Sequence, residues 1–176
     1  VFLDLKYHDI PNTVANACKA ASDLGVWMLN VHALGGPAML AAAREALAGK
    51  DAPLLIAVTI LTSSSDDDLR AVGINQGAGD MVRRLAALAS DQGLDGVVCS
   101  AREAAALRSL LGKDFILVTP GIRLPTDDAG DQKRIVSPRD AIESGSDYLV
   151  IGRPITQAED PVQKLLTINS DIARLF

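Results

Sequence analysis

Short apolar runs alternate with longer amphipathic stretches along the whole chain. The short runs are almost continuously apolar, as strands buried on both faces are, and we predict strands at residues 1–6, 27–32, 54–59, 96–100, 116–119 and 148–151. In the longer stretches apolar positions recur at intervals of three and four, which predicts helices at residues 13–24, 37–48, 79–92, 101–111, 138–144 and 161–175. Gly25, Gly93 and Gly145 follow three of these helices, where left-handed caps are common.

Strand and helix alternate six times, which predicts parallel strands joined by right-handed crossovers. A doubly wound open sheet and a (β/α)8 TIM barrel both fit this pattern. The first strand is not followed by G-x-G-x-x-G, and polar residues cluster after several strands, so we favour the barrel. Six units are two short of eight. Because the chain begins at Val1, without Met and already within a strand, we expect a single barrel domain over residues 1–176 that lacks its first two units.

The composition narrows the possible partners. Apolar residues make up 48 % of the 176 residues and aromatic residues only 3 %, so we expect one folded domain with an aliphatic core. The net charge of −5, without any Lys/Arg-rich block, argues against nucleic acid. Charges, Gly or Pro interrupt every apolar run, so we expect no membrane span or signal peptide. Cys18 and Cys99 lie far apart and are expected to be buried free thiols in a cytoplasmic protein.

The string DLKYHDIPNT, residues 4–13, carries the strongest chemical signal. In a strand, Asp4 and Lys6 point to the same side, and Leu3 and Leu5 point the other way, towards helices. Opposite charges inside a barrel are costly to bury unless they are paired. The pair is therefore either catalytic or a structural ion pair at the barrel mouth. After this strand, Pro11 ends the extended run, and Asn12 or Thr13 can cap the next helix.

The complete string resembles the catalytic signature of the orotidine 5′-phosphate decarboxylase family, in which D-x-K-x-x-D is followed by I-P-N-T. The shorter D-x-K-x-x-D also occurs in related sugar-phosphate decarboxylases and aldolases. The resemblance implies a TIM barrel that converts orotidine 5′-phosphate to uridine 5′-phosphate and CO2 without a cofactor. It implies catalytic roles for Asp4, Lys6 and Asp9, with Lys6 as proton donor. It also implies a homodimer in which Asp9 reaches the neighbouring site, and ligand contacts from Ile10, Pro11 and Thr13.

Two further motifs point to a phosphate group. The strings TPGIR and IGRPIT end the last two predicted strands and place Arg123, Gly152 and Arg153 at the barrel rim. Arginine binds phosphate in a bidentate manner, and phosphate sites after the last strands recur in TIM barrels. Taken alone, Arg123 could equally be an exposed loop arginine. Both strings match the resembled family, which also implies a phosphate contact from Gln132, within a predicted lid at residues 124–137.

Other polar residues near the strand ends carry weaker signals. The resemblance implies a ligand contact for Thr62, which by itself is an ordinary loop threonine. Asn30 and His32 end the second predicted strand, and we expect indirect roles for them at most. His8 is not the proton donor in the resembled family, and His8 and His32 make no metal triad, so we expect no metal site.

Two competing interpretations stay open. The first is a metal-dependent relative, a 3-keto-gulonate-phosphate decarboxylase or hexulose-phosphate synthase, which the continuation from His8 to Thr13 disfavours. The second is a non-catalytic fragment that binds nucleotide or only assembles. The second arises because the resemblance implies a further aspartate and a further lysine upstream of Val1, so that this chain carries only part of the active site.

Overall fold

One six-stranded parallel sheet forms the centre of the protein, seen in a computed structural model that describes residues 1–49, 51–124 and 136–175. The spatial order of the strands follows their order along the chain. They are β1 Phe2–Tyr7, β2 Met28–His32, β3 Leu54–Val58, β4 Gly96–Val98, β5 Ile116–Thr119 and β6 Tyr148–Leu149. A doubly wound sheet reverses its strand order at a switch point, so this order excludes that alternative. It agrees with six consecutive units of a (β/α)8 barrel.

All six predicted helices are present, within two residues of the predicted ends: α1 Pro11–Asp23, α2 Gly36–Ala46, α4 Ala78–Asp91, α5 Ala101–Leu111, α6 Pro138–Glu143 and α8 Pro161–Ala173. Gly25, Gly93 and Gly145 have φ angles of 69°, 73° and 103°, which confirms the predicted left-handed glycines. The predicted cap of the first helix is wrong. That helix begins at Pro11, which needs no N–H partner in the first turn, and no side chain caps it.

Three short helices are absent from the prediction: η1 Ala33–Gly35, α3 Asp66–Ala71 and α7 Arg153–Thr156. Each is too short for a helical period to stand out. The start of α3 nevertheless carries a local signal, because Ser65 and Asp68 form a capping box and three aspartates fill the first turn.

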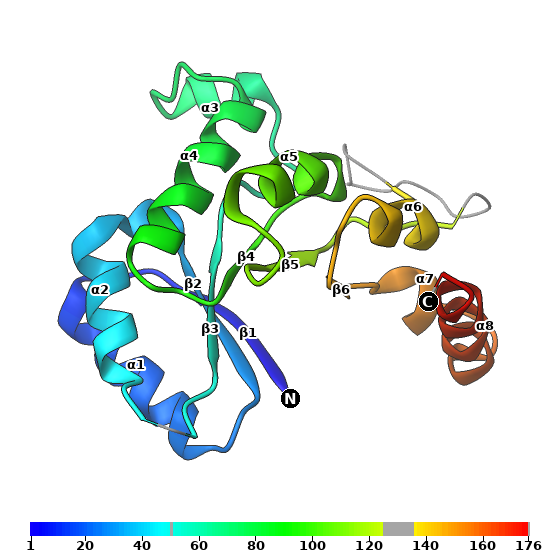
Figure 1. Ribbon diagram of the computed structural model, residues 1–176, viewed down its shortest axis with the longest axis horizontal. Coiled ribbons are helices and arrows are strands. Elements are labelled where there is room, and N and C mark those ends of the chain that lie inside the picture. The colour runs from blue at the N-terminus through cyan, green and yellow to red at the C-terminus, as the bar shows by residue number, and fades with distance from the viewer. Residues whose placement is uncertain (50, 125–135, 176) are drawn as a thin grey trace.

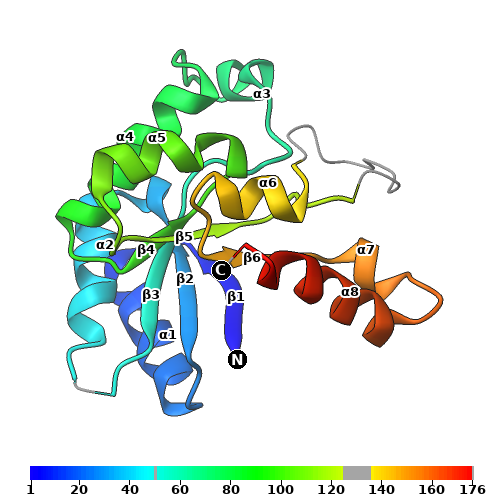
Figure 2. The same cartoon turned by 45° about the vertical axis from the view of Figure 1, so that its right-hand side comes forward.

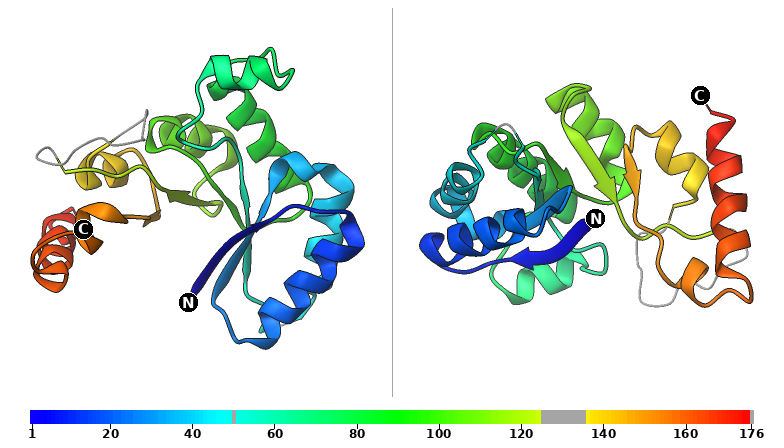
Figure 3. Two further views of the ribbon diagram at one scale, coloured as in Figure 1. Left: turned by 180° about the vertical axis from the view of Figure 1, so that it is seen from behind. Right: turned by 90° about the horizontal axis from the view of Figure 1, so that it is seen from below.

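The helices cover one side of the curved sheet. In Figures 1 and 2 the strands run from β1 at one edge to β6 at the other, and α1, α2, α4 and α5 lie along the outer face. The view from below in Figure 3 shows α6 and α8 continuing beside the β6 edge. Strands therefore line the inside and helices the outside, as in a barrel.

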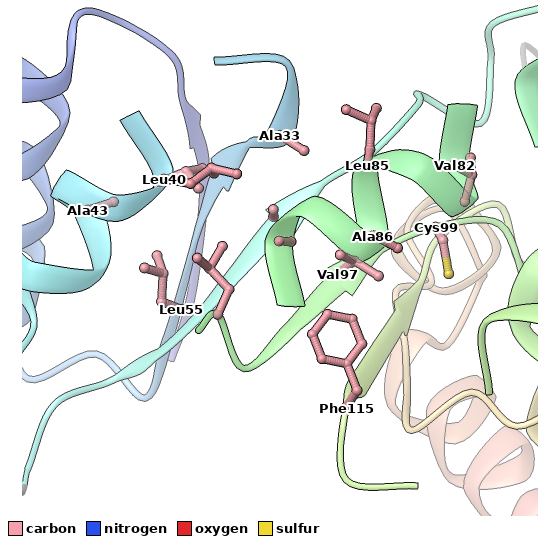
Figure 4. Close-up of a cluster of buried hydrophobic side chains, with 14 of the residues drawn as sticks. Ala33, Leu40, Ala43, Leu55, Val82, Leu85, Ala86, Val97, Cys99 and Phe115 are labelled. Atoms are coloured by element: carbon pink, nitrogen blue, oxygen red, sulfur yellow. The ribbon is translucent and has the colours of Figure 1, made fainter. Parts of the chain in front are cut away.

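Alternate strand residues enter two different cores. The outer core joins strand residues such as Leu55 and Val97 to helix residues such as Leu40 and Ala86, all fully buried (Figure 4). The inner core lies on the concave side and contains Met28, Ile56 and Val118, with Phe2, Leu54, Val98, Ile116 and Val150 packed around them. Cys18 and Cys99 are buried free thiols, as predicted. The inner face is the one that carries the candidate site at its carboxyl end.

Candidate active site at the carboxyl ends of the strands

Asp4 and Lys6 meet at the end of β1. The Lys6 Nζ atom donates to Asp4 Oδ1 at 2.7 Å, and both side chains are 41 % exposed. The expectation that a strict two-residue period buries Leu5 among helices is wrong, because Leu5 is 57 % exposed. The pairing with β2 shifts between Leu3 and Tyr7, and Lys6 has a left-handed φ of 54°. This irregularity interrupts the alternation and turns Lys6 back towards Asp4.

Asn30 connects both of these residues to β2. Its Nδ2 atom donates to Asp4 Oδ1 at 2.6 Å, and its Oδ1 atom accepts the backbone N–H of Lys6 at 2.8 Å. The Asn30 side chain is fully buried. Two donors, an ammonium and an amide, thus converge on one carboxylate oxygen. Sequence reasoning gave Asn30 at most an indirect role, although its spacing from the inner-core residue Met28 already indicated an inward direction.

A pocket of about 200 Å³ opens beside the ion pair. Its polar lining includes Asp4 and Lys6 from β1 and Thr62 from the loop after β3. The rest of the wall is mainly apolar: Phe2, Val58, Ile60, Leu61, Ser63, Val98, Pro120 and Val150. Few polar groups at one end of an apolar cavity are typical of a small-molecule site. The structure therefore brings three of the predicted site residues together, and adds a wall that the sequence motifs do not reveal.

The remaining residues of the DLKYHDIPNT string lie outside this pocket. Asp9, Ile10, Pro11 and Thr13 are exposed at the start of α1. The Asp9 Oδ1 atom accepts the backbone N–H of Ile10 at 2.7 Å. Within the string, Asp4 and Lys6 thus line the pocket, whereas residues 9–13 are exposed.

The predicted phosphate residues that the structure describes, Arg123, Gly152 and Arg153, are not among the residues that line the pocket. Gly152 and Arg153 are exposed where α7 begins. Arg123 is only 7 % exposed, and its Nη1 atom donates to the Ile122 carbonyl at 2.8 Å, so the alternative of an exposed loop arginine is wrong. Gln132 and most of the predicted lid lie outside the described residues. The arrangement of a phosphate site is therefore a prediction from the sequence.

Two histidines stack beside the ion pair. The His8 and His32 rings are 5.4 Å apart at an angle of 25°, and His32 Nδ1 accepts the backbone N–H of Leu34 at 3.4 Å. Burial lowers the pKa of His32, and the nearby His8 and Lys6 lower it further. Within residues 1–49, 51–124 and 136–175, no group of three or more His, Cys, Asp or Glu side chains is arranged to hold a metal ion.

Comparison with known proteins identifies the family of this chain. The model of the orotidine 5′-phosphate decarboxylase / HUMPS family matches residues 1–168. The chain belongs to this family. An orotidine 5′-phosphate decarboxylase of Actinobacillus pleuropneumoniae is 62 % identical over 174 residues, which are 98 % of this chain and 76 % of the relative. An orotidine 5′-phosphate decarboxylase of Escherichia coli is 59 % identical over 176 residues, which are 99 % of this chain and 72 % of the relative.

Solved structures agree with the assignment to the orotidine 5′-phosphate decarboxylase family. The crystal structure of orotidine 5′-phosphate decarboxylase from Lactobacillus acidophilus has a TM-score of 0.84 at 44 % identity, over 97 % of this chain and 74 % of that one. The enzyme from Pyrococcus horikoshii, at 24 % identity and a TM-score of 0.74 over 98 % of this chain and 73 % of that one, supports the fold alone. The chain thus spans about three quarters of the length of these family members. None of the helices described is long and apolar enough to cross a membrane.

Proposed function

We propose that this chain catalyses the decarboxylation of orotidine 5′-phosphate to uridine 5′-phosphate and CO2 in pyrimidine biosynthesis. The observation that carries the proposal is the Asp4–Lys6 ion pair in the wall of the pocket, within a member of this family. The pocket is large enough for a planar base, and its apolar wall suits the faces of a pyrimidine ring.

Lys6 acts as the proton donor, without a cofactor. When the bond between C6 and the carboxylate breaks, the electron pair stays on C6 and CO2 departs. The ammonium of Lys6 stabilises the negative charge that develops there and then delivers its proton to C6. The hydrogen bond from Lys6 Nζ to Asp4 supports this role, because it fixes the direction of the flexible lysine side chain.

Asp4 lies near the departing carboxylate in this mechanism. Two like charges about 4 Å apart repel by about 4 kcal/mol at an effective dielectric of about 20. Solvent screening makes the effect smaller here, because the Asp4 side chain is 41 % exposed. Repulsion relieved on loss of CO2 therefore contributes less than this figure. The same screening acts on the ammonium of Lys6, whose side chain is equally exposed.

The predicted site residues that do not line the pocket serve substrate binding and assembly. Arg123, Gln132, Gly152 and Arg153 hold the 5′-phosphate, and their binding energy positions the base at the reacting centre. The exposure of Asp9, Ile10, Pro11 and Thr13 at the start of α1 supports a role across a homodimer interface, where Asp9 contributes to the neighbouring site. The buried free thiols are compatible with a cytoplasmic location.

The test is release of CO2 from orotidine 5′-phosphate by the purified protein. We expect activity that survives excess EDTA, and loss of at least about a thousandfold in kcat for Lys6→Ala, which removes the proton donor. Lys6→Ala should still bind uridine 5′-phosphate. The control Lys19→Ala removes an exposed lysine of α1 and should keep full activity.

The competing interpretations give different outcomes in the same experiment. Activity that EDTA abolishes would support the metal-dependent relative and overturn the cofactor-independent mechanism. Wild-type protein that binds uridine 5′-phosphate but releases no CO2 would support a nucleotide-binding chain without catalysis. Near wild-type turnover by Lys6→Ala would exclude Lys6 as the proton donor.

A further inference from the structure

Asn30 occupies an unusual position for a polar residue. It lies on β2 next to the inner core, where its neighbour two residues earlier, Met28, is fully buried among apolar side chains. Its own side chain is also fully buried. A buried primary amide is costly unless its donor and acceptor are both satisfied. Both ends of the Asn30 amide are used, and both are used by the candidate catalytic residues Asp4 and Lys6.

The two hydrogen bonds fix the orientation of the amide. The backbone N–H of Lys6 can only donate, so the Asn30 oxygen must face it at 2.8 Å. An ionised Asp4 carboxylate can only accept, so the Asn30 nitrogen must face Asp4 at 2.6 Å. Neither an ionised Asp nor Leu could replace Asn in both roles, because a carboxylate only accepts and Leu does neither, whereas the amide offers a donor and an acceptor on the same planar group.

The acceptor end holds a strained backbone. Among the described residues, Lys6 is the one non-glycine residue with positive φ, at 54°. This conformation is unfavourable for residues with a side chain, and it persists only where the surroundings hold it. It is also the conformation in which the Lys6 side chain returns along the strand to Asp4.

We propose that Asn30 is a positioning residue for the catalytic pair. The oxygen of its amide holds the Lys6 backbone in the left-handed conformation, and the nitrogen holds the Asp4 carboxylate. The positioning role of Asn30 rests on the proposed function for its effect on turnover, but not for its effect on the backbone. Without the two hydrogen bonds of Asn30, Lys6 relaxes towards an ordinary strand conformation, and the ammonium no longer lies beside Asp4 and the pocket.

Steady-state kinetics on orotidine 5′-phosphate test the effect on turnover. We expect Asn30→Ala to lower kcat about 10- to 100-fold, as loss of a buried hydrogen bond to a charged group does, while KM changes less than about threefold. Asn30→Asp keeps the acceptor for Lys6 but places a second carboxylate beside Asp4, so kcat should fall at least as far. The matched control is Thr59→Val, which removes another fully buried polar group at the end of a neighbouring strand, where the Thr59 hydroxyl donates to the Val98 carbonyl at 2.8 Å. Thr59→Val should lower Tm and leave kcat unchanged.

A double-mutant cycle tests the effect of Asn30 on the backbone of residue 6 without an activity measurement. Glycine adopts positive φ without strain, so in a Lys6→Gly background the backbone at residue 6 does not need the hydrogen bond to Asn30 to keep this conformation. Asn30→Ala should therefore lower Tm by a clearly smaller amount in that background than in a Lys6→Ala background. Equal shifts in Tm in both backgrounds would contradict the positioning role of Asn30, even if the protein has no decarboxylase activity.

The experiments can thus contradict the proposed function and the positioning role of Asn30 separately. An inactive wild-type protein contradicts the proposed function, whereas an active wild type with unchanged kcat in both Asn30 variants contradicts the positioning role. If Asn30→Ala does not fold, Asn30→Asp, which is isosteric, carries the kinetic test. A loss of kcat in Thr59→Val equal to that in Asn30→Ala would also count against the proposal, because any buried polar group would then have the same effect.

Discussion

Carboxylates at the two ends of the sheet are similarly exposed but have different partners. At the carboxyl end, Asp4 is half-exposed, lies beside a strained backbone and pairs with a lysine in the wall of a pocket. At the amino end, Asp95 and Asp147 sit just before β4 and β6 and pair with helix arginines. The carboxyl end of such barrels carries the chemistry, and the amino end carries stability. Aspartate can therefore suit either purpose, depending on the groups that it binds.

The amino-end pairs repeat one arrangement at two places. The Asp95 Oδ2 atom accepts the backbone N–H of Leu55 at 2.7 Å and Arg44 Nη1 at 3.1 Å, which ties the start of β3 to α2. The Asp147 Oδ2 atom accepts the backbone N–H of Leu117 at 2.7 Å and Arg108 Nη2 at 2.7 Å, which ties β5 to α5. In each case the aspartate backbone N–H also donates to the carbonyl of the same strand residue, at 2.9 Å. Each pair therefore joins a strand, its neighbour and a helix.

The largest expected loss of stability lies at the amino end, at Gly96. A Cβ atom there would lie 2.2 Å from the carbonyl oxygen of Ile116 and 2.6 Å from its Cβ, so β4 and β5 cannot keep their distance. We expect Gly96→Ala to lower the free energy of unfolding by more than about 3 kcal/mol. Urea denaturation measures this. The control Gly79→Ala, in α4 with open space around it, should be neutral or slightly stabilising, so equal losses in both variants would contradict the packing argument.

The next effect is at Asp147. In Asp147→Ala the N–H of Leu117 loses its side-chain acceptor, and Arg108 keeps only its carbonyl partners, so we expect a loss of about 1–3 kcal/mol in stability. Affinity for uridine 5′-phosphate should stay unchanged, because this pair lies at the end of the sheet away from the pocket. Asp114→Ala, at an exposed aspartate before β5, is the matched control and should change stability by less than about 0.5 kcal/mol. A weaker affinity for uridine 5′-phosphate in folded Asp147→Ala would contradict the claim that the amino end affects stability alone.

The sequence predicts the elements and the layers of the fold better than the geometry of the site. Continuous apolar runs such as residues 54–58 identify buried parallel strands, and glycines such as Gly145 mark helix ends, because these signals are local. The left-handed turn at Lys6 is not local. It depends on an amide from β2, so a two-residue period alone wrongly buries Leu5.

Side-chain partners across the sheet escape sequence reasoning for the same reason. Asp4 and Lys6 are close in sequence, and their pairing follows from their charges, whereas Asn30 is 24 residues beyond Lys6. Arg108 and Asp147 are 39 residues apart and belong to no recognised motif. Their contact follows from the closing of β5 against β6, which fixes distances that the pattern of apolar residues leaves open.

A smaller effect of opposite sign is expected at the carboxyl end. Replacing Lys6 by glycine removes the strain of positive φ, so Lys6→Gly should be more stable than Lys6→Ala by about 1 kcal/mol, although we expect both variants to be inactive. Thermal or urea unfolding of the two variants measures the difference. At Leu5, whose φ is not positive, the Gly variant should instead be less stable than the Ala variant. If Lys6→Gly is the less stable of its pair, the carboxyl end stores no strain at this residue.

The smallest effect is the acid sensitivity of the carboxyl end. Burial lowers the pKa of His32 below its usual value of 6.5, and His8 and Lys6 lower it further. The unfolded chain therefore binds a proton more readily at this residue than the folded chain does, so its contribution to stability is complete above pH 6.5 and is lost as the pH falls through the folded pKa. His32→Gln should flatten the decline in Tm below pH 6.5. His8→Gln should flatten it less, because burial of His32, which it leaves in place, is the larger cause. An unchanged decline in His32→Gln would assign the acid sensitivity to other groups.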